Sequence, residues 1–142
     1  MDEEDVEEAN ADVVVEEDEE DRATKDRRQQ YFVRSRLERE TMYSQLLATY
    51  QKMYNNINST AEQKSEAMGR ISEINRVRNA IMIAENLVVA RGIEDIVIFA
   101  NSNSTSVVIK AEEITPEQMA QVQHIVSREL AIGIETMNIS TK

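Results

Sequence analysis

The residues of this chain that could do chemistry are few and lie far apart. The sequence holds a single histidine, His124, and two pairs of neighbouring carboxylates at positions 94–95 and 112–113. Acid–base catalysis by a carboxylate pair requires both groups to face one substrate. Neighbouring residues in an extended segment point to opposite faces, so neither pair is suited to this chemistry. His124 is opposite the apolar positions of its predicted helix, which indicates an exposed side chain that is neither a base nor a metal ligand.

Composition excludes further classes of function. The chain contains no cysteine, no tryptophan, three glycines and one proline. These counts exclude a disulfide framework, a thiol nucleophile, a cysteine-type zinc site and a glycine-rich phosphate loop. We therefore predict no catalytic, cofactor-binding or metal-binding residues, no small-molecule substrate and no enzymatic activity. A domain with so few reactive groups usually works by binding another macromolecule.

The sequence shows neither a membrane span nor a signal peptide. A span needs roughly 18–20 apolar residues, and the richest apolar run, residues 81–90, is interrupted by Glu85 and Asn86. A signal peptide begins with basic and then apolar residues, whereas Met1 is followed by acidic ones. We expect the chain as given to be soluble and, at 142 residues, to hold one folded domain.

The net charge of −11 is concentrated at the N-terminus. Thirteen of the 27 acidic residues lie within residues 1–21, which contain no lysine or arginine, and the other fourteen accompany all 16 basic residues. Such an acidic segment buries too little apolar surface to offset the cost of ordering it. We predict a disordered linker over residues 1–25 that acts as a spacer. An acidic mimic that docks on a basic partner is the alternative.

A basic stretch follows the acidic segment. Residues 22–39 carry seven lysines or arginines together with Tyr31 and Phe32. No second aromatic cluster follows that could stack bases, so we expect no nucleic-acid partner.

Two helices are predicted next. The first runs from about Asp26 to the polar residues 55–59, and its apolar side chains recur at helical spacing. This predicted packing stripe consists of Tyr43, Leu46, Leu47, Tyr50, Met53, Tyr54 and Ile57. The second helix starts at Thr60, which forms a capping box with Gln63, and ends before Gly92, where a left-handed residue belongs. Its predicted buried face consists of Met68, Ile71, Ile74, Val77, Ile81, Ala84 and Val88.

The remaining elements are two short strands, a helix and a final strand. Residues 94–100 and 106–111 are rich in β-branched side chains, and the polar loop 101–104 suits a hairpin between them. Thr115 caps the next helix with Gln118 as its capping-box partner and Pro116 at the first position. Residues 134–139 read as the last strand. The order α-β-β-α-β from residue 60 onward predicts an α+β fold, a three-stranded sheet with helices on one face, preceded by an extra N-terminal helix.

The last strand is predicted to lie at an edge of the sheet. The hairpin makes the first two strands neighbours, so the third cannot lie between them. A right-handed crossover favours a parallel place beside the second strand, and an antiparallel place beside the first is open. An unprotected edge attracts another strand. We therefore predict a partner interface along this strand and on the first strand, formed by Ile134, Glu135, Thr136, Met137, Asn138, Ile139, Ile96 and Ile98.

Four segments together resemble the family of stage III sporulation protein AH. They are residues 60–67 (TAEQKSEA), 90–98 (ARGIEDIVI), 107–111 (VVIKA) and 115–120 (TPEQMA). Each segment alone is a common capping or turn sequence. The resemblance rests on their order and spacing along the chain, and it covers roughly residues 30–140. It implies a ring-building motif at residues 60–142, related to rings of type III secretion systems and flagellar basal bodies, with residues 26–59 as a helix that packs on it.

The resemblance also implies a function. The family belongs to the channel complex between mother cell and forespore in endospore formation, as single-pass proteins of the mother-cell (outer forespore) membrane. Their domain lies in the intermembrane space, binds stage II sporulation protein Q from the forespore and assembles into a ring. Family members begin with a membrane anchor and a polar linker. No anchor is seen here, and we expect this sequence to begin within the linker.

Two other classes of binding module have a related order of elements. A small-ligand regulatory domain of ferredoxin-like topology is the main alternative, but its sites usually need glycine-rich turns, and only Gly133 is available near the loops. An RNA-binding KH module would need a Gly-x-x-Gly loop, which is absent, and a folded part with a charge near +2 is poorly suited to phosphates.

The charge distribution yields a first testable prediction. Removal of residues 1–25 should leave the melting temperature within a few degrees of its original value and should preserve binding to a Q-type partner. The reason is that every capping signal and apolar stripe lies downstream of this segment. Thermal denaturation and light scattering of the mixture measure the two effects. A large loss of stability, or loss of the complex, would show that the acidic segment is more than a tether.

Overall fold

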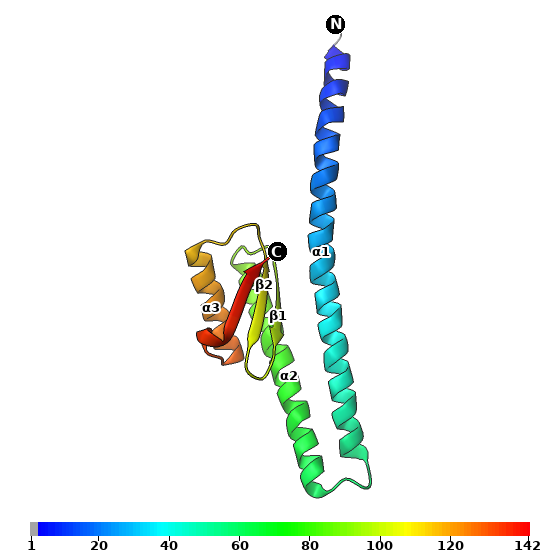
Figure 1. Ribbon diagram of the computed structural model, residues 1–142, viewed down its shortest axis with the longest axis vertical. Coiled ribbons are helices and arrows are strands. Elements are labelled where there is room, and N and C mark those ends of the chain that lie inside the picture. The colour runs from blue at the N-terminus through cyan, green and yellow to red at the C-terminus, as the bar shows by residue number, and fades with distance from the viewer. Residues whose placement is uncertain (1–2) are drawn as a thin grey trace. The chain divides into compact units, whose positions relative to one another are not determined.

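The computed structural model describes residues 3–142, with side chains from residue 19 onward. Its elements, shown in Figure 1, are α1 (Glu3–Asn55), α2 (Ala61–Ala90), β1 (Asp95–Ala100), β2 (Thr105–Lys110), α3 (Pro116–Leu130), the 3-10 turn η1 (Ile134–Thr136) and β3 (Met137–Thr141). Contacts divide the chain into two compact units, Met1–Arg34 and Ser35–Lys142. This boundary lies inside α1, and the division into 1–25, 26–59 and 60–142 stays a prediction.

The N-terminal helix begins earlier than the sequence suggested. It starts at Glu3, so the predicted start near Asp26 is wrong. Disorder is predicted for residues 1–25. Part of this segment lies outside the described residues, because residues 1–2 and the side chains of residues 1–18 are not described. Helical hydrogen bonds are local, no glycine or proline interrupts residues 3–55, and acidic residues near a helix N-terminus interact favourably with the helix dipole. Helix formation here therefore needs no burial, and residues 19–27 are indeed exposed.

The buried side of α1 also differs from the predicted stripe. Within residues 35–55 the buried positions are Ser35, Arg39 and Tyr43, spaced four residues apart. Leu46 and Tyr54 are exposed, and Ile57, which is 93% exposed, lies in the turn after the helix. Periodicity identified a helix but not the face that meets a neighbour, because that face includes a serine and an arginine.

Local signals placed α2 correctly. Thr60 and Gln63 form the reciprocal capping box, and Gly92 adopts the predicted left-handed backbone with φ of 99°. Most of the predicted face is buried or half-buried, whereas Met68 is exposed. The helix buries Ala67, Ala80, Ile81, Ala84, Glu85 and Val88. Glu85 is the one charged residue among them, and its partners define the site described below.

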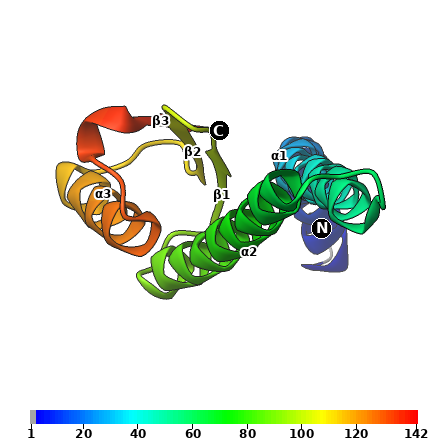
Figure 2. The same ribbon diagram turned by 90° about the horizontal axis from the view of Figure 1, so that it is seen from below.

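The three strands form one sheet in the order β1-β2-β3. The first two are antiparallel, with Val97 opposite Val108, and β3 runs parallel to β2, with Ile139 opposite Val107. Helices α2 and α3 cover the same face of this sheet (Figure 2). The core between them includes Ile98, Val107 and Val126, none of which is exposed. The predicted α+β fold, with helices on one face and an extra N-terminal helix, is confirmed.

The last strand is shifted relative to the prediction. Residues 134–136 are not extended but form η1, in which the backbone N–H and the hydroxyl of Thr136 donate to the carbonyl of Gly133 at 3.1 and 2.7 Å. The strand then occupies Met137–Thr141. Of the two places left open by the sequence, the structure has the parallel one beside β2. The prediction of an edge strand is confirmed.

An alanine ends α3 where glycine would be expected. Ala131 has φ of 55°, and its N–H donates to the carbonyl of Ser127. Residues with a Cβ are strained in this left-handed region, whereas glycine is not. Gly133, the nearest glycine, instead has φ of −74°.

We predict opposite effects of two substitutions at these helix ends. Ala131→Gly should raise the free energy of unfolding by about 0.5–1 kcal/mol, because it relieves left-handed strain. Gly92→Ala should lower the free energy of unfolding by about 1 kcal/mol, because it places a Cβ on a left-handed backbone. A Cβ at this position would meet no other atom within 4 Å, so backbone strain is the whole of the expected effect. Urea denaturation measures both. If both substitutions raise the free energy of unfolding, or both lower it, this assignment of backbone strain is wrong.

Candidate functional site

The candidate site consists of the two edges of the sheet. An edge strand presents unpaired N–H and C=O groups that can accept a further strand. In this sheet β1 forms one edge and β3 the other. The two edges differ in how their outward backbone groups are bonded.

The β1 edge is closed first at Ile96. The N–H of Ile96 donates to Oδ1 of Asp95 at 2.8 Å, and its carbonyl accepts from Nη2 of Arg36 at 3.0 Å. Arg36, from α1, also forms an ion pair with Asp95. Both outward groups of this residue therefore have side-chain partners.

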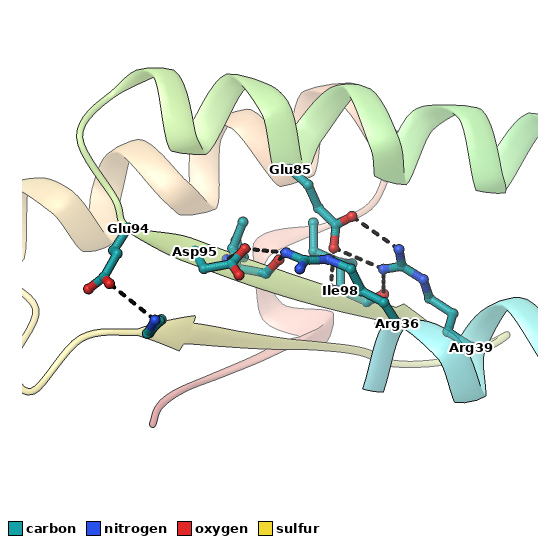
Figure 3. Close-up of polar contacts among 8 residues, drawn as sticks. Arg36, Arg39, Glu85, Glu94, Asp95 and Ile98 are labelled. Carbon is teal, nitrogen blue, oxygen red and sulfur yellow. Dashed lines mark hydrogen bonds and ion pairs between the residues drawn. The ribbon is translucent and has the colours of Figure 1, made fainter. Parts of the chain in front are cut away.

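The same edge is closed again at Ile98. Its N–H donates to Oε2 of Glu85 at 2.9 Å, and its carbonyl accepts from Nη1 of Arg39 at 2.9 Å. Arg39 and Glu85 bind each other through two hydrogen bonds of 2.8 and 3.1 Å. Figure 3 shows Arg36 and Arg39 reaching from α1 toward β1, and Glu85 reaching from α2 to the same place.

The pair at Ile98 is buried. Arg39 and Glu85 are each 8% exposed. Isolated buried charges are costly, and such a pair is tolerated only when its remaining polar atoms are also bonded. Here Ile98 supplies both a donor and an acceptor to the pair, although Nε of Arg39 has no described partner. Charge-assisted hydrogen bonds of this kind are stronger than the neutral bonds of a sheet.

A second set of contacts lies beside this pair. Arg78 of α2 donates to Glu40 of α1 at 2.6 Å, and its guanidinium lies 5.8 Å from the ring centroid of Tyr43. Burial raises the pKa of the Tyr43 hydroxyl above its ordinary value, while nearby Arg39 opposes the shift. Tyr43 is therefore neutral at physiological pH. These contacts orient the segment of α1 that carries Arg36 and Arg39.

The β3 edge has the opposite character. The N–H of Lys142 donates to the carbonyl of Ile109 at 2.8 Å. In a parallel pair of strands, the backbone N–H and C=O groups of successive residues point alternately toward and away from the neighbouring strand. Because Lys142 is bonded to β2, the backbone groups of Asn138 and Ser140 also face β2, and those of Ile139 and Thr141 face outward. Among the hydrogen bonds of the described residues, none joins a side chain to these outward groups. This edge is open.

The predicted interface residues fall into two groups. Those near β3 lie at the surface: Ile134, Glu135 and Asn138 are exposed, and Thr136, Met137 and Ile139 are half-buried. Ile96 and Ile98 have no exposed surface, so the prediction that they lie open is wrong. Their side chains belong to the core under α2 and α3, and the charged side chains already occupy their outward backbone groups.

The sequence analysis missed the residues that close β1. These are Arg36, Arg39, Glu85 and Asp95. One signal was present: Glu85 falls on the same helical stripe as Ile81, Ala84 and Val88, and a carboxylate at a core position implies a buried cationic partner. Which arginine supplies that partner could not be read from the sequence, because Arg39 lies 46 positions away.

An open groove of about 580 Å³ lies elsewhere on the second unit. Apolar side chains such as Met42, Leu46 and Ile74 line it, together with Arg70 and an ion pair between Glu73 and Arg76 at 2.8 Å. The hydrogen bond from Arg76 lowers the pKa of Glu73. These two charges neutralise each other, and Asn101, Ser102 and Thr105 supply further polar groups to the lining of the groove.

Other chemistry is not supported by the described residues. His124 is exposed on α3, as predicted. No group of three or more histidine, cysteine, aspartate or glutamate residues in the described part of the chain could hold a metal ion. Among the described residues, no helix has the length and apolar character required to cross a membrane.

Comparisons with known proteins agree with the fold. The family model described as SpoIIIAH-like protein matches residues 1–139. The chain belongs to this family. The resemblance to stage III sporulation protein AH is thereby confirmed, and none of the curated proteins matches the sequence significantly.

A solved structure has the same fold. It is described as the structure of the SpoIIQ-SpoIIIAH pore forming complex, and the matching chain in it is 19% identical, with a TM-score of 0.68. The match covers 79% of this chain and 95% of that one. The family supports a role in sporulation, and the structural match shows a shared fold.

The buried pair yields a prediction on stability. Glu85→Ala should lower the free energy of unfolding by about 3–5 kcal/mol, because it leaves Arg39 buried without a carboxylate. The double variant Arg39→Met/Glu85→Met should be much closer to the parent, since it removes both charges. Glu73→Ala, at an exposed pair, serves as the control and should change stability by under about 1 kcal/mol. If urea denaturation gives equal losses for Glu85→Ala and Glu73→Ala, the pair is not buried as described.

Proposed function

We propose that this chain is a structural protein–protein interaction domain of the channel complex between mother cell and forespore. Its partner is a stage II sporulation protein Q-type protein, and it binds that partner through the open edge of β3. The family supports the biological setting, and the matching fold comes from a complex described as containing SpoIIQ. The single observation that carries the choice of surface is the contrast between a closed β1 edge and an open β3 edge.

The open edge determines the pattern of a strand that could bind to it. Met137 and Ile139 lie on the side of the sheet that α2 and α3 cover, since they are in register with core positions of β2. Asn138 and Ser140 lie on the other face and are exposed. An added strand continues this alternation. The partner strand therefore presents apolar side chains toward α3 and polar side chains on the opposite face.

The family supports a proposal for the setting of the domain. The chain is the intermembrane-space part of a single-pass protein of the mother-cell (outer forespore) membrane, tethered through an N-terminal anchor. Copies assemble into a ring, as the ring-building motif implies, and a heterologous contact produces a ring when its rotation closes. The acidic segment 1–25 is the tether between anchor and domain.

Proline substitutions in β3 test the proposed edge. Thr141→Pro and Ile139→Pro remove outward N–H groups, so they should weaken binding of a Q-type partner at least tenfold while the circular dichroism spectrum stays near native. Ser140→Pro is the matched control, because its N–H faces β2 and its side chain, like that of Thr141, is exposed. This variant should mainly lose stability.

Light scattering and titration of the mixed proteins measure the complex. If Thr141→Pro and Ile139→Pro both fold and bind the partner normally, the partner does not add a strand at β3. Equal loss of structure in all three variants would contradict the assigned direction of the backbone groups.

A further inference from the structure

The two edges of this sheet would fit each other if both were open. Continuation of the sheet from one copy to the next requires the β3 edge of one molecule to pair with the β1 edge of another. The outward residues include Ile139 and Thr141 on β3, and Ile96 and Ile98 on β1, so both edges offer groups two residues apart. A head-to-tail contact of this kind has no built-in end and produces open chains of molecules unless the rotation closes.

We infer that the Arg36–Asp95 and Arg39–Glu85 pairs prevent this continuation and limit each molecule to one added strand, at β3. The inference rests on the β3 edge as the strand-binding surface proposed above. It assigns a specificity role to four residues that are remote from that surface. Their effect is to exclude the β3 strand of a second copy from β1.

The bonding of β1 gives the physical reason. An incoming strand would have to displace the hydrogen bonds that occupy the N–H and C=O groups of both Ile96 and Ile98. Displacement at Ile98 would also leave Arg39 and Glu85 buried beside a neutral strand. Backbone groups of that strand cannot replace a charge-assisted pair. Of the outward residues of β1, only Ala100 lies beyond this closed stretch, and one residue cannot hold a strand.

The closed edge has a consequence for assembly. Two free copies can pair through their sheets only as β3 with β3, which is a two-fold contact that stops at a dimer. Binding of a partner strand at β3 removes even that contact. Contacts between copies in a ring therefore use surfaces other than the sheet edges, and each copy retains β3 for one partner strand.

The test opens β1 and follows self-association in the absence of any partner. The variant Arg36→Met/Arg39→Met/Glu85→Met removes the side-chain partners from three of the four outward groups, and it removes both buried charges at Ile98. Sedimentation velocity over a hundredfold concentration range should show species larger than a dimer that grow with concentration, unlike the parent. Thr141→Pro added to this variant should restore the parent distribution, because it blocks the β3 side of the same contact.

Two outcomes would overturn the inference. One is a folded triple variant with the size distribution of the parent, and the other is growth that Thr141→Pro does not reverse. Hydrogen exchange on the unmodified protein adds a measurement that needs no variant to fold. The amides of Ile96 and Ile98 should exchange at least tenfold more slowly than those of Ile139 and Thr141, and equal rates would show that β1 is not closed.

This experiment separates failure of the inference from failure of the proposed function. Self-association of the triple variant involves only this chain and reports on β1. Binding of the Q-type partner to the single variants in β3 reports on the proposed function. Normal partner binding by Thr141→Pro, together with edge-dependent growth of the triple variant, would refute the proposed interface and leave the role of the two pairs intact.

Discussion

The ion pair between Arg39 and Glu85 connects three elements that are distant in sequence. Arg39 comes from α1, Glu85 from α2, and both bind the backbone of Ile98 in β1. Burial of either charge alone would cost much free energy. The guanidinium of Arg39 is stabilised by the carboxylate of Glu85 and the carbonyl of Ile98, and the carboxylate of Glu85 is stabilised by Arg39 and the N–H of Ile98. The position of Arg39 beside the sheet and the bonding of Ile98 in the β1 edge therefore depend on the same four hydrogen bonds.

The pair and the apolar core have different roles in this domain. Apolar burial between the sheet and helices α2 and α3 provides most of the stability, since it removes whole side chains such as Ile98, Val107 and Val126 from water. It does not distinguish one edge of the sheet from the other. The charged pairs contribute less to net stability, because desolvation offsets much of their attraction, but they act on one edge only. The difference between the two edges of the sheet therefore has an electrostatic origin.

The sequence predicted the features that depend on neighbouring residues. The capping boxes at Thr60 and Thr115, the left-handed Gly92 and the hairpin at 101–104 all follow from local chemistry, and together they led to the correct fold. Features that depend on distant contacts were missed or misplaced. The carboxylate of Glu85 looked like an interruption of an apolar run, although it is a core residue with an arginine partner. Residues 134–136 were assigned to a strand because their turn, closed on Gly133, leaves little signal in composition.

The match at 19% identity bears on how function is encoded in this fold. A match at that identity shows a shared fold, and the fold alone does not specify a partner. In the proposed mode of binding, a partner strand is selected by the backbone groups that remain available once the core has formed. This selection depends on the charged side chains that bind the β1 edge, while the β3 edge has no such side chains among its described contacts. Under this proposal, a change of these residues would alter the binding surface without altering the fold.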